Sequence, residues 1–129
     1  MSWLSRIFGK IADHRQQPEA EFTLTFDEVE ITLSDPKGVV RHLDIADLSA
    51  VIIETNDTGP WGMDVWWVLL NQDGKLGLIF PQGATGEKRV ADRLIALPGF
   101  DHAEFIKAMG STANATFPVW KKSASSAPD

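Results

Sequence analysis

The sequence predicts one α+β domain: an antiparallel sheet or partly open barrel of about seven strands, with two helices before the last strand. Three observations predict this fold. Between residues 22 and 80, apolar side chains recur mostly at every second position, as in half-buried strands. Short turns separate these stretches, which makes neighbouring strands antiparallel. After Pro81 the apolar spacing becomes that of helices.

The first 17 residues predict a short amphipathic helix followed by a polar linker. Five apolar side chains recur at the spacing of one helical face: Trp3, Leu4, Ile7, Phe8 and Ile11. Two interpretations stay open. The helix packs back on the domain, or residues 3–11 attach to a membrane surface or a partner, with Arg6 and Lys10 facing water.

The first half of the domain predicts four strands, over residues 22–26, 29–33, 39–45 and 50–55. The alternation changes phase between Phe26 and Val29, which requires a tight turn or a β-bulge there. Asp35-Pro36-Lys37-Gly38 is a turn sequence, because Pro presets φ and Gly adopts the left-handed conformation.

A hairpin is the clearest element of the second half. Its strands run over 65–71 and 76–80, and Asp73-Gly74 between them favours a type I′ turn. A helix follows over 87–97, capped by Thr85 or a neighbouring residue and ended by Pro98-Gly99.

A second short helix and a strand complete the predicted domain. Asp101 and Glu104 form a pair like a capping box at the start of this helix, and Gly110 ends it. Pro118 places the strand 116–120 at an edge of the sheet. The domain therefore spans residues 18–121, and the Ser/Ala-rich residues 122–129 are expected to be a disordered tail.

Two resemblances accompany these elements. The strand-rich arrangement resembles a pleckstrin-homology domain, although that fold has a single terminal helix. Residues 39–121 resemble a family of small bacterial proteins with no activity attached to it. The resemblance rests on Phe80-Pro81-Gln82-Gly83-Ala84-Thr85-Gly86-Glu87, Leu97-Pro98-Gly99-Phe100-Asp101, Ala108-Met109 and Trp120. It implies a bacterial origin and no particular function.

The amino-acid composition limits the chemistry that the protein can perform and indicates its cellular compartment. The chain has no cysteine, which excludes a disulfide framework and thiol catalysis and disfavours a zinc site. Arg6 and Lys10 interrupt the apolar N-terminal stretch, so no signal peptide is predicted. The longest apolar run, Val65–Leu70, is much shorter than the ~20 residues of a membrane helix. We expect a cytoplasmic protein.

The formal net charge of −6 is unevenly distributed. Residues 18–60 hold ten acidic residues against Lys37 and Arg41, a net charge of −8. Such a surface repels nucleic acid and attracts a basic partner. The alternative is that these charges only keep the protein in solution.

Catalytic and metal-binding patterns are weak. The three histidines, His14, His42 and His102, accompany no Gly-x-Ser-x-Gly elbow, so no catalytic triad is predicted. Asp57 and Asp64 flank one loop, but their spacing matches no calcium loop. We therefore expect neither an enzyme nor a metal or cofactor.

The segment 83–88 is a candidate anion-binding loop, because it joins a strand to a helix N-terminus. Its candidate residues are Gly83, Thr85, Gly86 and Lys88. The Walker pattern requires Gly-Lys at the end of the loop, whereas this chain has Gly-Glu-Lys. Glu87 also repels an anion there. The alternative is that the glycines only allow a sharp turn.

The tryptophans suggest an interaction surface. Trp66 and Trp67 are adjacent on one strand, so their side chains point to opposite faces of the sheet. The leading hypothesis is a non-enzymatic interaction module that binds a basic partner, such as a bacterial immunity or inhibitor protein. The predicted contact residues are Asp57, Trp61, Met63, Asp64 and Trp66. The alternative is a domain that binds a small molecule or a lipid head group at the barrel mouth or at the loop 83–88.

Overall fold

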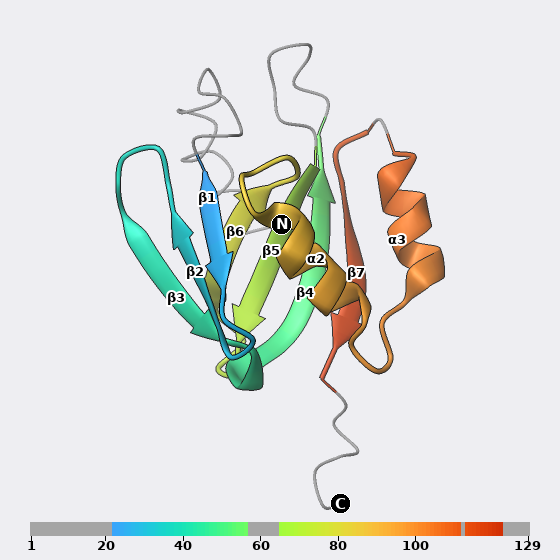
Figure 1. The fold of residues 1–129 in the computed structure, drawn as a ribbon. Helices are drawn as coiled ribbons and strands as arrows, with labels where there is room; N and C mark the ends of the chain where they lie inside the picture. Colours follow the sequence, from blue (N-terminus) through green and yellow to red (C-terminus); the bar gives the residue numbers. More distant parts are fainter. Residues whose placement is uncertain (1–21, 57–64, 112, 123–129) are drawn as a thin grey trace, which may run out of the picture.

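The computed structural model describes residues 22–56, 65–111 and 113–122. These ranges form two antiparallel sheets and two α-helices (Figure 1), which confirms the α+β class. The sheets have the strand orders β1-β2-β3 and β6-β5-β4-β7, and the described strands do not close into a barrel. The predicted N-terminal helix lies outside the described residues.

The three-stranded sheet consists of β1 (Thr23–Phe26), β2 (Glu30–Ser34) and β3 (Val40–Asp44). The predicted tight turn joins β1 to β2. Its Asp27 carboxylate accepts the N–H groups of Val29 at 3.0 Å and Glu30 at 2.8 Å, and Glu28 has a φ of 80°. Val29 therefore lies in the turn and is exposed, instead of beginning the second strand.

A short 3-10 helix, η2 (Ile45–Asp47), separates the two sheets. The Ile45 N–H donates to the Val29 carbonyl at 2.9 Å, which extends the β2–β3 pairing by one position before the chain turns into η2. The next strand then pairs with two later strands and not with β3. The described residues thus contain seven antiparallel strands, as expected, but the strands form two sheets of three and four, because η2 lies between β3 and β4 and these two strands do not pair.

The four-stranded sheet consists of β4 (Leu48–Thr55), β5 (Val65–Asn71), β6 (Leu76–Pro81) and β7 (Ala115–Lys121). β7 occupies an edge, as Pro118 predicted. The β5–β6 turn differs from the predicted type I′. Gly74 has a φ of 76° and its N–H donates to the Asn71 carbonyl at 2.8 Å, but Asp73 does not have a positive φ. This is a three-residue loop with a left-handed glycine at its end.

The helices are α2 (Glu87–Ile95) and α3 (His102–Met109). The N-cap residue of α2 is Gly86, the neighbour of Thr85, with a φ of 84°, and no side chain forms a capping hydrogen bond there. The predicted cap of α3 is confirmed, since the Asp101 carboxylate accepts the Glu104 N–H at 2.9 Å.

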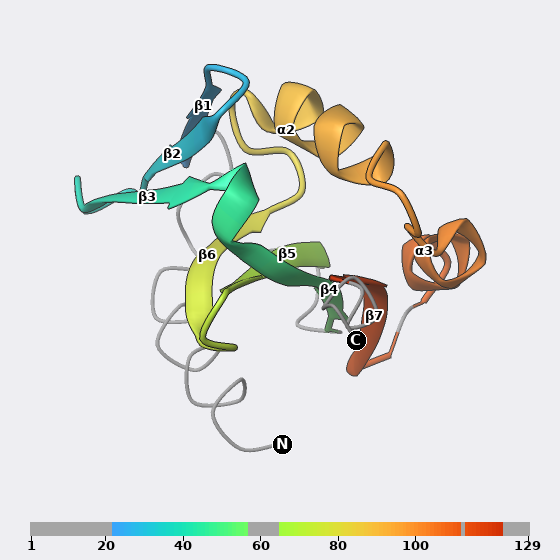
Figure 2. The same ribbon diagram turned by 90° about the horizontal axis from the view of Figure 1, so that it is seen from below.

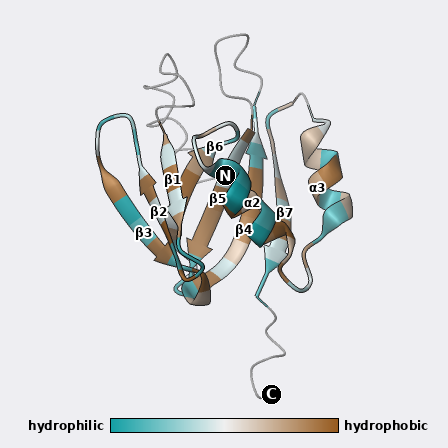
Figure 3. Ribbon diagram, in the orientation of Figure 1, coloured by the Kyte–Doolittle hydropathy of each residue, from teal (hydrophilic) through white to brown (hydrophobic). Residues whose placement is uncertain are grey.

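Both helices pack on one face of the four-stranded sheet through Trp67. Its Nε1 donates to Glu87 of α2 at 3.0 Å, and its ring lies 5.6 Å from that of Phe105 in α3. Figure 2 shows α2, β1 and β2 on one side of this sheet. In Figure 3 hydrophobic residues colour much of β5 and β6, whereas the outer surface of α2 is hydrophilic. Nowhere in the described ranges is a helix both long and apolar enough to cross a membrane.

Strand register divides this sheet into two faces, because paired residues share a face. We call one the helix face; it carries Val51, Ile53, Trp67, Leu69, Leu78 and Phe80. We call the other the rear face; it carries Ile52, Glu54, Trp66, Val68 and Ile79. The two adjacent tryptophans thus point to opposite faces, as predicted, and both are buried.

Candidate functional site

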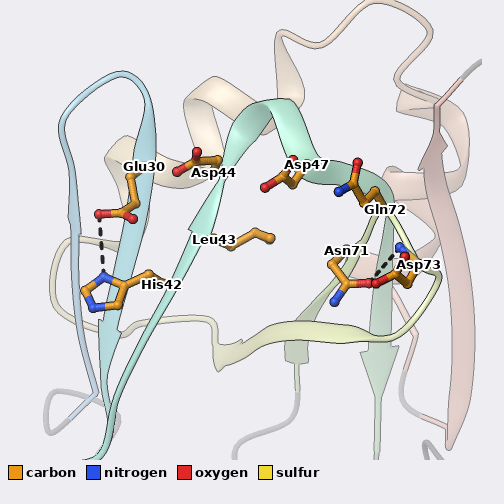
Figure 4. A pocket seen from close by; sticks show the side chains of 8 residues that line it. All are labelled: Glu30, His42, Leu43, Asp44, Asp47, Asn71, Gln72 and Asp73. Atoms are coloured by element: carbon orange, nitrogen blue, oxygen red, sulfur yellow. Dashed lines mark hydrogen bonds and ion pairs between the residues drawn. The ribbon is translucent and has the colours of Figure 1, made fainter.

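An open hollow of about 380 Å³ lies where β2, β3 and η2 approach the β5–β6 turn (Figure 4). We call it the acidic hollow; its lining residues are Glu30, His42, Leu43, Asp44, Asp47, Asn71, Gln72 and Asp73. In Figure 4 Glu30 and His42 stand on one side and the turn residues on the other, with Asp44 and Asp47 between them.

Local structure fixes each wall of the acidic hollow. Glu30 and Asp44 are directly paired across β2 and β3. On the opposite wall, the Asn71 Oδ1 accepts the N–H groups of Asp73 at 2.9 Å and Lys75 at 3.1 Å. The Ser49 hydroxyl donates to the Asn71 carbonyl at 2.6 Å, which ties this turn to β4. Both walls are therefore held by the fold.

Negative charge dominates the hollow. Four carboxylates line it, and His42 is the one basic side chain among its lining residues. Within the described part of the chain, the carboxylates of Asp44, Asp47 and Asp73 form no hydrogen bond or ion pair. A concave surface with several unneutralised carboxylates concentrates cations and attracts basic groups.

His42 is held by two neighbours on a single ring nitrogen. Its Nδ1 lies 3.1 Å from the Thr32 hydroxyl and 3.5 Å from the Glu30 carboxylate. In a hydroxyl–histidine–acid relay the hydroxyl and the acid contact different ring nitrogens. The arrangement therefore orients the imidazole without activating Thr32 as a nucleophile.

Metal binding has no matching geometry in the described ranges. No three His, Asp or Glu side chains there come close enough together to hold an ion. The carboxylates of the acidic hollow are spread along its rim, so they suit a larger basic group better than one ion.

The predicted partner residues and the acidic hollow do not coincide. Asp57, Trp61, Met63 and Asp64 lie outside the described residues. Trp66 is only 4% exposed and packs its ring edge-on against Phe22 at 5.7 Å, so it offers no contact surface.

The position of the hollow along the sheet reinforces this separation. Thr55 and Val65, which flank residues 57–64, are paired at one end of β4 and β5. Leu48 and Asn71 are paired at the other end, beside the acidic hollow. The hollow is therefore built from residues other than those of the predicted loop.

The candidate anion loop serves as a link within the fold. The Thr85 N–H donates to Phe22 at 2.9 Å, and the Thr85 carbonyl accepts from Leu24 at 2.7 Å. The Ala84 N–H donates to the Pro81 carbonyl at the end of β6 at 3.3 Å, and the Glu87 N–H donates to the Ala84 carbonyl at 3.0 Å. These three amides are thus engaged within the protein instead of pointing at an anion.

The other candidate residues of this loop also have structural surroundings. Gly83 and Gly86 have φ values of 97° and 84°, so both supply left-handed turns, as the alternative interpretation expected. The Lys88 Nζ pairs with Asp92 at 3.0 Å along α2. The geometry supports a sharp link from β6 to α2 better than a phosphate site.

Sequence reasoning found the charge of the acidic hollow but not its location. The excess of acids over residues 18–60 includes Glu30, Asp44 and Asp47. Asn71, Gln72 and Asp73 were interpreted only as turn residues. Nothing in a single sequence pairs that turn with η2, because they meet only through the register of β4 with β5.

Comparison of the chain with protein-family models, curated proteins and solved structures finds no match. The resemblance of residues 39–121 to a small bacterial family therefore stays a prediction. The case for a function depends on the geometry of the acidic hollow.

Proposed function

We propose that this chain is a non-enzymatic interaction module that binds a basic protein partner at the acidic hollow. One observation carries the proposal: four carboxylates line this hollow, and those of Asp44, Asp47 and Asp73 form no ion pair in the described structure. A Lys or Arg side chain from a partner supplies the missing charge.

The shape of the hollow supports a protein partner. It is open, and its walls are a β-hairpin and a tight turn that the fold holds in place. Rigid walls reduce the ordering cost of association. Asn71 and Gln72 add amide groups that can bind the backbone or side chains of a partner.

Within this class, an immunity or inhibitor protein that neutralises a basic bacterial toxin fits the acidity and small size of the chain. The bacterial origin rests on the resemblance of residues 39–121. Electrostatic attraction would give such a pair fast association that weakens with salt.

The test is affinity capture from host cells by the full-length chain at low and at moderate salt. Captured proteins are then purified and titrated individually. The hollow variant is Asp44→Asn with Asp47→Asn, and the matched control is Asp92→Asn with Glu28→Gln, which removes two carboxylates elsewhere.

The proposal predicts a basic partner whose Kd rises about tenfold or more in the hollow variant, with a shallower salt dependence. The control variant should bind within about twofold of the wild type. Equal binding by the wild type and the hollow variant, or a partner that is not basic, would overturn the assignment of this surface.

A further inference from the structure

The rear face of the four-stranded sheet is apolar and buried, yet the described elements pack elsewhere. Trp66, Val68 and Ile79 are 4%, 0% and 8% exposed. Trp67 places both helices on the helix face, and Figure 2 shows β1 and β2 on that side as well. Of the ring contacts in the described structure, the one between Phe22 and Trp66 reaches the rear face. A further segment must therefore cover Val68 and Ile79.

The sequence offers three segments outside the described ranges, and they differ in apolar content. Residues 123–129 read Ser-Ala-Ser-Ser-Ala-Pro-Asp and contain no large apolar side chain. Residues 57–64 contain two, Trp61 and Met63, but are tied to one end of the sheet by Thr55 and Val65. The N-terminal segment contains five on one predicted helical face: Trp3, Leu4, Ile7, Phe8 and Ile11.

The side chain of the first described residue contacts the rear face. Phe22 is the first described residue, and its ring meets that of Trp66 at an interplanar angle of 87°. The residues that precede Phe22 therefore start beside this face. Residues 12–21 can span up to about 33 Å, enough to bring the N-terminal segment back over any of the four strands.

The length of a helix over residues 3–11 also matches the width of the four-stranded sheet. Nine helical residues, 3–11, are about 14 Å long. Four strands at about 4.8 Å spacing are roughly 14 Å across between the outer two. A helix of this length crosses the sheet once, with its apolar stripe inward and with Arg6 and Lys10 directed to water.

We infer that residues 3–11 of this chain form an amphipathic helix that covers the rear face and completes the core. The sheet is then enclosed between α2 and α3 on the helix face and the N-terminal helix on the other. The apolar stripe is occupied within the molecule and does not serve as a membrane or partner anchor.

The direct test is NMR of the full-length chain with labelled methyl groups. Cross-relaxation peaks are expected between methyls of Ile7 or Ile11 and those of Val68 or Ile79. Peaks from Val68 and Ile79 to Trp61 or Met63, or peaks that appear only between differently labelled copies, would assign another occupant and overturn the inference.

A stability comparison gives a second, independent readout. Ile7→Asp places a charge on the apolar stripe and should lower Tm by at least about 5 °C. Ser5→Asp, on the polar side, is the matched control and should leave Tm within about 2 °C. An unchanged Tm in Ile7→Asp, together with binding of the wild type to phosphatidylserine vesicles, would instead make residues 3–11 a membrane anchor.

Discussion

Gly86 is the residue at which backbone geometry most restricts the sequence. It has a φ of 84°, and a Cβ built on it would collide with the carbonyl of Leu24. Its neighbour Thr85 forms the backbone link to β1. A residue with no side chain is therefore required where β6 turns into α2 against the three-stranded sheet.

Gly86→Ala should accordingly be far more destabilising than Gly99→Ala. Gly99 has a similar φ of 86°, but a Cβ there meets no atom within 4 Å. We expect the free energy of unfolding to fall by about 1 to 2 kcal/mol for Gly99→Ala and by at least twice that for Gly86→Ala. Urea denaturation measures both; equal losses would show that the contact with Leu24 does not matter.

Among the residues that the structure describes, Glu54 is the one whose pKa is raised. It lies on the rear face, its Oε1 is buried without a hydrogen-bond partner in the described structure, and burial raises its pKa above the ordinary value of 4.5. The folded state therefore holds the Glu54 proton more tightly than the unfolded state. The resulting penalty is absent below pH 4.5 and grows as pH rises through the pKa of the folded protein.

Glu54→Gln should raise Tm at pH 7, and the gain should vanish toward pH 4. The physical reason is that Gln is uncharged at every pH and avoids the burial of a carboxylate. Asp92→Asn, which removes an exposed carboxylate on α2, should change stability by less than about 0.5 kcal/mol at either pH. A Glu54→Gln gain that is the same at both pH values would contradict this account.

At the scale of elements, the stability of α3 depends on its N-cap residue, Asp101. The Asp101 carboxylate accepts the Glu104 N–H, and the Asp101 N–H donates to the Val119 carbonyl at 2.6 Å. The same residue thus begins α3 and attaches it to β7. Asp101→Ala should reduce the free energy of unfolding by about 1 kcal/mol, whereas Asp101→Asn, which keeps a cap acceptor, should cost only a few tenths. Thermal unfolding that does not distinguish the two substitutions would contradict the role of the cap.

Elements defined by local patterns were predictable, and those defined by long-range packing were not. The alternation at Leu24 and Phe26 and the cap at Asp101 are local signals, and the structure confirms both. The division into two sheets depends on the pairing of β4 with β5 and β7, and the β4–β7 pairing joins residues far apart in sequence. The prediction of a type I′ turn at Asp73-Gly74 was wrong because the Asn71 side chain stabilises a longer loop.

At the scale of the whole molecule, the candidate site was also predictable in its local composition but not in its long-range packing. The acidity of the first half was readable in Glu30, Asp44 and Asp47. Their convergence with Asp73 was not, because η2 and the β5–β6 turn meet only after β4 pairs with β5. Trp66 was proposed for the surface since adjacent tryptophans cannot share a face, but the rear face is buried as well.

The acidic hollow gives the protein one concave and strongly negative surface. A basic ligand should bind there in preference to the other exposed acids, such as Asp92, which already pairs with Lys88. Salt should weaken that binding steeply, because the carboxylates are exposed to solvent. Site preference, more than affinity, therefore distinguishes the proposal from general attraction to an acidic protein.

The most direct test is an NMR titration of the nitrogen-labelled full-length chain with a lysine-rich peptide at low and moderate salt. The account predicts that the largest amide shifts fall on Asp44, Asp47 and Asp73, decrease with salt, and are lost in the Asp44→Asn/Asp47→Asn variant. Shifts centred on α2 or α3, or shifts that the variant leaves unchanged, would contradict the assignment of the acidic hollow as the binding surface.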